Sequence, residues 1–332
     1  MKSLKSFLKT GAFSLLGLGL VTAPAQAVNI TTSSEIDPNV LVNNILGSGI
    51  TISNATYQGA SIASGTFTGG LASGIGIESG IILTTGNANL AVGPNTSESA
   101  SRRNNLTGDA DLSALISGVK TFDASVLEFE FISTTGNLFF NYVFASEEYN
   151  EYVNSKYNDV FGFFLDGKNI ALIPGTDTPV SINTVNGGNP FGNNATNPQL
   201  FNNNSLADGG AIYNLQYDGF TNVFSAQFKG LSEGTHRLKI AIADVGDYRY
   251  DSAVFIQAGT FSSRPLQEEI PNPTPVTQSE IPNPTPVTQP EIPEPTPPIQ
   301  KVPEPTTVIG LLVSAAFGAT SLRKYQQQKI LN

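Results

Sequence analysis

The strongest constraint on the fold of this chain is a series of short runs in which apolar and polar residues alternate. The clearest runs are VLEFEFI at 126–132 and LFFNYVFA at 138–145, and a further apolar run, DVFGFFLDG, follows at 159–167. A period of two places every second side chain on one face of an extended strand. We therefore predict a sheet protein in which two core strands hold an acidic loop between them.

Further short runs of this kind lie on both sides of that stretch, separated by glycine-containing turns. They occupy residues 50–57, 64–70, 78–87, 222–228, 236–244 and 252–261. The turn residues Thr135-Gly136-Asn137 and Asp166-Gly167 predict that the adjoining runs fold back as hairpins. We expect a mostly β fold, an antiparallel β-sandwich or jelly-roll-like domain.

One or two short helices accompany these strands. Asp37 followed by Pro38 is typical of a helix N-cap and first helical position, and TGDADLSALIS at 107–117 is typical of a capped helical turn. Residues 183–204 are rich in Asn and Gly, and we expect them to form a long surface loop.

Composition excludes several classes of function. The chain has no Cys and a single His, so thiolate zinc sites, disulfides and thiol chemistry are absent. Its 27 acidic residues outnumber its 17 basic ones, and the two ends carry six of the basic residues. Residues 28–305 therefore hold 11 basic and 27 acidic residues, a charge of −16 that argues against nucleic-acid binding and suits cation binding.

The N-terminus is typical of a secretory signal peptide. Three Lys precede an apolar run at 12–21, and Ala25 and Ala27 form a small-x-small cleavage site. We expect export through the Sec translocon and removal of residues 1–27, which leaves a β-domain over residues 28–262.

The C-terminal part has a different composition. An 11-residue repeat starts at Glu269, Glu280 and Glu291, and Pro every two or three residues predicts a disordered, polyproline-II-like linker over residues 263–301. An uncharged apolar run at 306–322 is just long enough to span a membrane as a helix, and Arg323-Lys324 follows it. This charge pattern predicts that the β-domain faces outward.

Residues 302–332 resemble the PEP-CTERM sorting signal of Gram-negative bacteria and cyanobacteria. The match consists of Val302, Pro303, Glu304 and Pro305, then the apolar run and the basic end. The resemblance implies a partner, a membrane enzyme of the exosortase type that cuts at or near Pro-Glu-Pro. It also implies a route: transient anchoring in the inner membrane, then transfer to the cell surface or extracellular matrix.

The body of the chain resembles the choice-of-anchor L family, in order and over most of residues 35–262. The matching segments are GDADL at 108–112, NYVFASEEYNEYV at 141–153, NDVFGFFLDG at 158–167, NIALIPGTDTPVSINTVN at 169–186, YDGFT at 217–221 and IADVGDYRYDSAVFIQAGTF at 242–261. The resemblance implies a β-sandwich-like domain displayed at the surface, and it implies no particular reaction.

Two groups of carboxylates lie at the ends of predicted strands and are candidate Ca²⁺ ligands. The candidate residues are Glu147, Glu148, Asp159, Asp244, Asp247 and Asp251. Ca²⁺ takes six to eight oxygen ligands, and a divalent ion relieves repulsion between adjacent carboxylates. The alternative is a solvated acidic rim in which Asp residues cap turns. Asp109 and Asp111 are a separate, weaker candidate pair.

Enzymatic functions find little support in the sequence. Two of the carboxylates could serve a glycosidase, but no spacing singles out such a pair. His236 has no Gly-x-Ser-x-Gly motif nearby for triad hydrolysis. We expect a non-enzymatic structural or adhesive surface domain, stabilised by calcium and associated with extracellular polysaccharide. The alternative is a carbohydrate-binding, lectin-like or carbohydrate-cleaving module, because Tyr149, Tyr152 and Tyr157 could stack on sugars.

Overall fold

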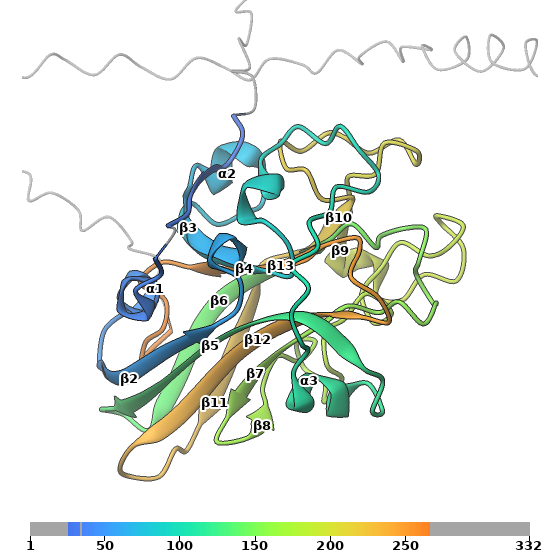
Figure 1. The fold of residues 1–332 in the computed structure, drawn as a ribbon. Coiled ribbons are helices and arrows are strands. Elements are labelled where there is room, and N and C mark those ends of the chain that lie inside the picture. The colour runs from blue at the N-terminus through green and yellow to red at the C-terminus, as the bar shows by residue number, and fades with distance from the viewer. Residues whose placement is uncertain (1–25, 34, 266–332) are drawn as a thin grey trace, which may run out of the picture. The chain divides into compact units, whose positions relative to one another are not determined.

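A computed structural model describes residues 26–33 and 35–265 of the chain. They form two antiparallel sheets packed one behind the other (Figure 1). The larger sheet has the strand order β1-β3-β4-β13-β6-β10-β9, with β11 also paired to β6, and the smaller sheet has the order β2-β5-β12-β7-β8. The predicted mostly β, sandwich-like fold is confirmed.

The strands of the larger sheet are β1 (Asn29–Thr31), β3 (Ser64–Thr68), β4 (Gly80–Thr84), β6 (Asn137–Ser146), β9 (Phe201–Asn203), β10 (Gly219–Thr221), β11 (Phe224–Lys229) and β13 (Ser252–Gln257). Those of the smaller sheet are β2 (Ile50–Gln58), β5 (Thr121–Ser133), β7 (Val160–Leu165), β8 (Lys168–Asn169) and β12 (His236–Val245). Three short α-helices, one more than expected, are α1 (Pro38–Ile45), α2 (Gly70–Ser73) and α3 (Ala110–Leu115), and three 3-10 turns are η1 (Ser61–Ala63), η2 (Ala88–Ala91) and η3 (Pro198–Leu200).

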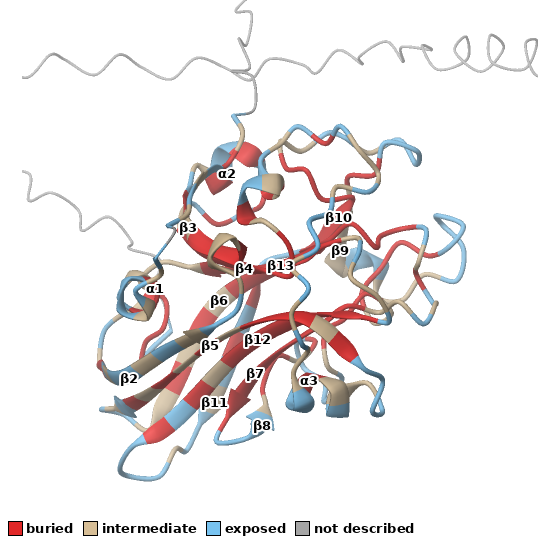
Figure 2. Ribbon diagram, viewed as in Figure 1, coloured by how far each residue is buried: buried red, intermediate tan, exposed pale blue. Residues whose placement is uncertain are grey.

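Aromatic side chains fill the space between the sheets. Phe140 and Tyr142 of β6 each place their ring centroid 4.8 Å from that of Phe163 on β7, in edge-to-face geometry. Two smaller apolar groups lie on the outer faces of the sheets, one over the larger sheet and one beneath α3. Figure 2 shows that the central strands are largely buried. Loops and α3 cover part of each outer face, while β5 and β12 also carry charged residues such as Glu128 and Arg237 on the open part of the smaller sheet.

Several local predictions are confirmed. Asp37 caps α1 by accepting a hydrogen bond from the Asn39 backbone N–H at 2.9 Å. Asp166 and Gly167 form the turn between β7 and β8, both with positive φ, as a tight hairpin of this kind requires.

One predicted hairpin is wrong. The turn after β5 does not return the chain beside β5, because β5 pairs with β2 and β12 while β6 pairs with β10, β11 and β13. The segment between β5 and β6 crosses from the smaller sheet to the larger one. Alternation fixes which face of a strand is apolar but carries no information about the partner strand.

The predicted surface loop at 183–204 is also only partly a loop. Residues 201–203 form the edge strand β9, and Asn186 and Asn204 are fully buried. The Asn204 side-chain amide donates to the backbone carbonyls of Leu215 and Tyr217, at 2.8 and 3.0 Å. Asn is frequent here because its side chain satisfies buried backbone groups where no strand partner does.

The signal peptide apart from residues 26 and 27, the repeat linker beyond residue 265, the sorting motif and the expected membrane helix lie outside the described residues. Among the residues that the structure describes, no helix is long and apolar enough to cross a membrane.

Connections between the sheets bring the acidic segments to one end of the sandwich. Ser146 at the end of β6 pairs with Ser252 at the start of β13, and Val245 at the end of β12 pairs with Thr121 at the start of β5. Val160 at the start of β7 lies beside Ala243. The segments 85–120, 147–159 and 246–251 each pass from one sheet to the other at this end, which we call the acidic end.

Candidate metal centre

Three acidic side chains lie at the acidic end on the same faces of their strands as the apolar core residues, as strand alternation requires. On β12, Leu238, Ile240 and Ile242 face the space between the sheets, so Asp244 continues the same face. Asp159 precedes Phe161 and Phe163 in the same way, and Glu148 continues the inward face of β6 beyond Ser146. Asp251 continues the outer face of β13, which is marked by Ala253 and Phe255, but its charge raises the pKa of both Asp159 and Asp244, so it lies at the edge of this set. We call Glu148, Asp159 and Asp244, with Asp251 at their edge, the inner cluster.

The inner cluster is buried, and its hydrogen bonds are incomplete. Asp159 is satisfied, because its Oδ1 accepts from the Val245 N–H at 2.9 Å and its Oδ2 accepts from the Ser252 hydroxyl at 2.7 Å. Asp244 is only 1% exposed, and neither of its carboxylate oxygens has a hydrogen-bond partner. Glu148 Oε2 is buried and unpartnered as well.

Burial and mutual repulsion raise the pKa of every inner-cluster carboxyl. Burial is the main cause throughout. It raises the pKa of Glu148 to about 10, helped by the charges of Asp159 and Asp247, and that of Asp159 to about 8. The pKa of Asp244 lies well above its usual range, because burial and the charges of Asp159 and Asp251 outweigh the nearby Thr85 hydroxyl. The pKa of Asp251 rises to about 7, although the Arg102 N–H and the Ser101 hydroxyl donate to its carboxylate.

A second set of carboxylates lies on the opposite, outer face of the larger sheet. Val143 and Ala145 of β6 pack in the outer apolar group, so Glu147 continues that outer face. One carboxylate oxygen from each of Glu98, Glu151 and Asp218 lies within 4.8 Å of the other two. We call Glu98, Glu147, Glu151 and Asp218 the outer cluster.

The structure therefore divides the six predicted metal ligands. It places Glu148, Asp159 and Asp244 on the inward side, leaves Asp251 at their edge, and turns Glu147 to the other face of the sheet. Asp247 lies at the rim, where its carboxylate accepts from the Arg249 N–H at 2.9 Å and its charge raises the pKa of Glu148 and Asp159.

Two buried carboxyls, Asp123 and Asp218, were not anticipated as site residues. Asp123 lies in β5 with φ 45° where the register with β12 shifts, and its carboxylate accepts from the N–H groups of Asn104 and Leu106 at 2.8 and 2.5 Å. The predicted run began only at residue 126, so Asp123 lay outside it, and β5 begins earlier than the alternation indicated. Asp218 precedes the three-residue strand β10, which is too short to show alternation.

The weaker candidate pair, Asp109 and Asp111, has another role. Asp109 caps α3 by accepting from the N–H groups of Asp111 and Leu112. The Lys239 ammonium lies 2.5 Å from Asp109 Oδ2 and 2.7 Å from Asp111 Oδ2. This ammonium group already bridges the two carboxylates, so a metal ion is not needed there.

The single His lies at the other end of β12 from Asp244. His236 Nδ1 lies 2.6 Å from Asp166 Oδ2, and its Nε2 lies 2.9 Å from the Ser232 carbonyl oxygen. Both ring nitrogens are therefore engaged in joining the β7–β8 turn and the loop before β12.

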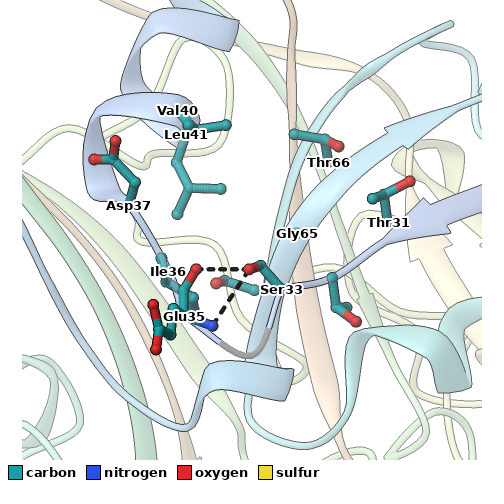
Figure 3. A pocket seen from close by; sticks show the side chains of 11 residues that line it. Thr31, Ser33, Glu35, Ile36, Asp37, Val40, Leu41, Gly65 and Thr66 are labelled. Carbon is teal, nitrogen blue, oxygen red and sulfur yellow. Dashed lines mark hydrogen bonds between the residues drawn. The ribbon is translucent and has the colours of Figure 1, made fainter.

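A hollow of about 290 Å³ lies between residues 31–33 and 35–37, α1 and β3, and no residue of the inner or outer cluster lines it (Figure 3). The Ser33 hydroxyl bonds the backbone of Glu35, and Asp37 is used as the α1 cap. The polar groups that line the hollow are thus used in local hydrogen bonds, and the hollow offers no convergent set of catalytic side chains.

Half-buried tyrosines lie near the acidic end. The ring of Tyr152 packs against Tyr157 and Tyr250, with centroid distances of 5.4 and 4.8 Å. Tyr149 is fully buried and packs against Phe201, so it is part of the core and cannot stack on a sugar.

Comparison with protein families gives one match. The model of a family described as the choice-of-anchor L domain matches residues 29–262. Comparisons with curated proteins and with solved structures find no match.

Proposed function

The chain belongs to the choice-of-anchor L domain family, which marks a cell-surface or extracellular β-domain. On this premise we propose that Ca²⁺ binds at the inner cluster and stabilises the domain. The domain serves a structural or adhesive role at the cell surface and is not an enzyme. Export, sorting and calcium binding are parts of this proposal.

One observation carries the calcium proposal. Asp244 is fully buried with two unpartnered oxygens, and the charges of Asp159, Asp251 and Asp123 act on it. An unpaired buried charge costs several kcal/mol, and within the described residues no Lys, Arg or His forms an ion pair with these carboxylates. Ca²⁺ prefers carboxylate and carbonyl oxygens from irregular loop positions, which is what the acidic end offers.

Calcium removal tests this proposal. EDTA is expected to lower the melting temperature of the purified protein, because an ion that binds the folded chain and not the unfolded one stabilises the fold, and the chelator removes that contribution. Asp244→Asn should abolish most of this response to EDTA, as measured by thermal unfolding with and without Ca²⁺ in excess.

The matched control is Asp177→Asn, which removes one carboxylate from an exposed loop outside both clusters. It should respond to EDTA as the wild type does. A wild-type melting curve that is the same in Ca²⁺ and in EDTA would refute the calcium proposal.

The non-catalytic part of the proposal is supported by the position of His236. It lies at the opposite end of β12 from the carboxylates, and both ring nitrogens are engaged. It therefore cannot serve as a base for a nucleophile at the acidic end.

A carbohydrate-binding role is the second candidate, and the tyrosines near the acidic end favour it. Tyr152 and Tyr250 are half-buried and present ring surface beside charged residues, as sugar-stacking residues do. A glycan-array screen with and without chelator separates the two roles. Calcium-dependent binding without turnover would indicate a lectin, absence of binding would leave a scaffold, and hydrolysis would contradict the non-enzymatic proposal.

A further inference from the structure

The outer cluster has the properties of a cation site in its own right. Its three closest carboxylate oxygens lie within 4.8 Å of one another, which matches two Ca–O distances of about 2.3–2.6 Å across one ion. Three loops contribute them: Glu98 from the segment after β4, Glu151 from the segment after β6, and Asp218 from the segment before β10.

Buried, unpartnered oxygens in this cluster point independently to a ligand. Asp218 is fully buried, and its Oδ1 accepts from the Asn95 side-chain amide at 2.7 Å while its Oδ2 has no partner. Glu147 is also fully buried, and its Oε2 accepts from the Ala100 N–H at 3.1 Å while its Oε1 has no partner. A buried carboxylate oxygen with no donor calls for a proton or a cation.

The negative charges in this cluster repel one another, and this raises the pKa of Glu147 and Asp218. Burial, then the Asp218 charge, raises the pKa of Glu147 to about 10. Burial, then the charges of Glu98, Glu151 and Asp208, raises the pKa of Asp218 to about 8 even though Asn95 donates to it. No described Lys, Arg or His pairs with any of the four side chains, so the repulsion lacks a counter-charge from the protein.

We propose that Glu98, Glu151 and Asp218, with Glu147 beside them, form a second Ca²⁺ site on the outer face of the larger sheet. It is distinct from the inner cluster, because Glu147 continues the outer face of β6 and Glu148 the inner one, just beyond the end of the strand. The two clusters are neighbours, since the charge of Asp251 acts on Glu147 and that of Glu151 acts on Glu148. It is reachable from solvent, because Glu151 is exposed.

Occupancy of this site fixes a neighbouring loop. Glu98 Oε2 accepts from the Ser205 hydroxyl at 3.0 Å, and its Oε1 accepts from the Ala207 N–H at 3.1 Å. Glu98 therefore links the cation to residues 204–217, which cover this face of the sheet between β9 and β10. Loss of the ion should loosen this loop before it affects the core.

Calcium titration by isothermal calorimetry of the purified full-length protein tests the proposal. The wild type should bind two ions per chain. Asp218→Asn should bind one, and Asp244→Asn should lose the other. Glu151→Gln, an exposed substitution that should not disturb folding, should weaken the outer site at least about tenfold because it removes one of the ligand charges.

Asp177→Asn should keep both ions, and chymotrypsin cleavage between residues 204 and 217 should increase in Asp218→Asn in the presence of Ca²⁺. If Asp218→Asn and Glu151→Gln bind calcium with the wild-type stoichiometry and affinity, the outer site does not exist. If Asp244→Asn alone has no effect on binding, the inner site fails while the outer one stands, so the two proposals fail separately.

Discussion

The pair formed by His236 and Asp166 makes a clear residue-scale prediction, because this is the only His in the chain. Burial lowers the pKa of His236, but its hydrogen bonds to Ser232 and Asp166 and the charge of that carboxylate raise it above 6.5 overall. The pKa of Asp166 is lowered, because the Arg237 N–H and His236 outweigh its partial burial.

The contact between His236 and Asp166 makes the stability of the fold depend on pH. A raised His pKa stabilises the fold fully below about pH 6.5, and this contribution is lost as the pH rises through the folded-state value. The lowered Asp166 pKa adds stability above its usual range, which is lost only as the pH falls through the folded-state value. The pair is therefore most stabilising in mildly acidic solution.

Titration of the single imidazole resonance by NMR measures this directly. We expect a midpoint above 6.5 in the wild type and a lower one in Asp166→Asn, which keeps the shape of the side chain but not its charge. Asp177→Asn serves as the control. An identical midpoint in Asp166→Asn would show that the contact does not set the pKa.

At the residue scale the candidate site was partly predictable. Inward-facing apolar residues at 238, 240 and 242 already place Asp244 on the core side, and the quoted motifs place Glu148 and Asp159 beside strand ends. Asp218 could not be predicted as a site residue, because a three-residue strand shows no periodicity. The placement of Glu147 and Glu148 in different clusters could not be predicted either, because the sequence does not show that both faces of β6 are covered.

At the element scale, α3 depends on its N-cap. Asp109→Ala removes the acceptor for two backbone N–H groups and one partner of Lys239, which should cost about 1 kcal/mol. For a domain of this size the expected fall in melting temperature is about 2–4 °C.

Asp111→Ala is the matched variant, because it also contacts Lys239 but caps nothing. Exposed ion pairs contribute little, so its effect should be less than half as large. Equal losses in the two variants would assign the stability to the ion pair instead of the cap.

The positions of the strands were far more predictable than their pairing. Alternation locates β6 and β12 closely and an apolar run locates β7, while β5 begins at Thr121, ahead of the run predicted at 126–132. It does not reveal that β5 and β6 lie in different sheets, because the partners of each are distant in sequence. Short edge elements such as β8 and β9 have too few residues for any periodic signal.

At the scale of the whole molecule, the proposed sorting route predicts a distinct result for Glu304→Ala. If a processing enzyme cuts at or near Pro303-Glu304-Pro305, the variant should retain full-length protein in the membrane fraction, as followed by immunoblot of membranes and medium. The control is Glu294→Ala, which alters an upstream Pro-Glu-Pro that no apolar run directly follows. Continued release of the Glu304→Ala protein would contradict this route.

The chain crosses repeatedly between the two sheets, and this has a consequence for how it acquires its structure. The Thr84 hydroxyl donates to the Ser252 carbonyl 168 residues away, and β13 lies between β4 and β6 in the middle of its sheet. Such distant pairings require closing long loops before they return free energy, which slows folding. The larger sheet cannot be completed until residues 252–257 have emerged, so a nascent chain should stay unfolded until nearly all of the domain has been synthesised.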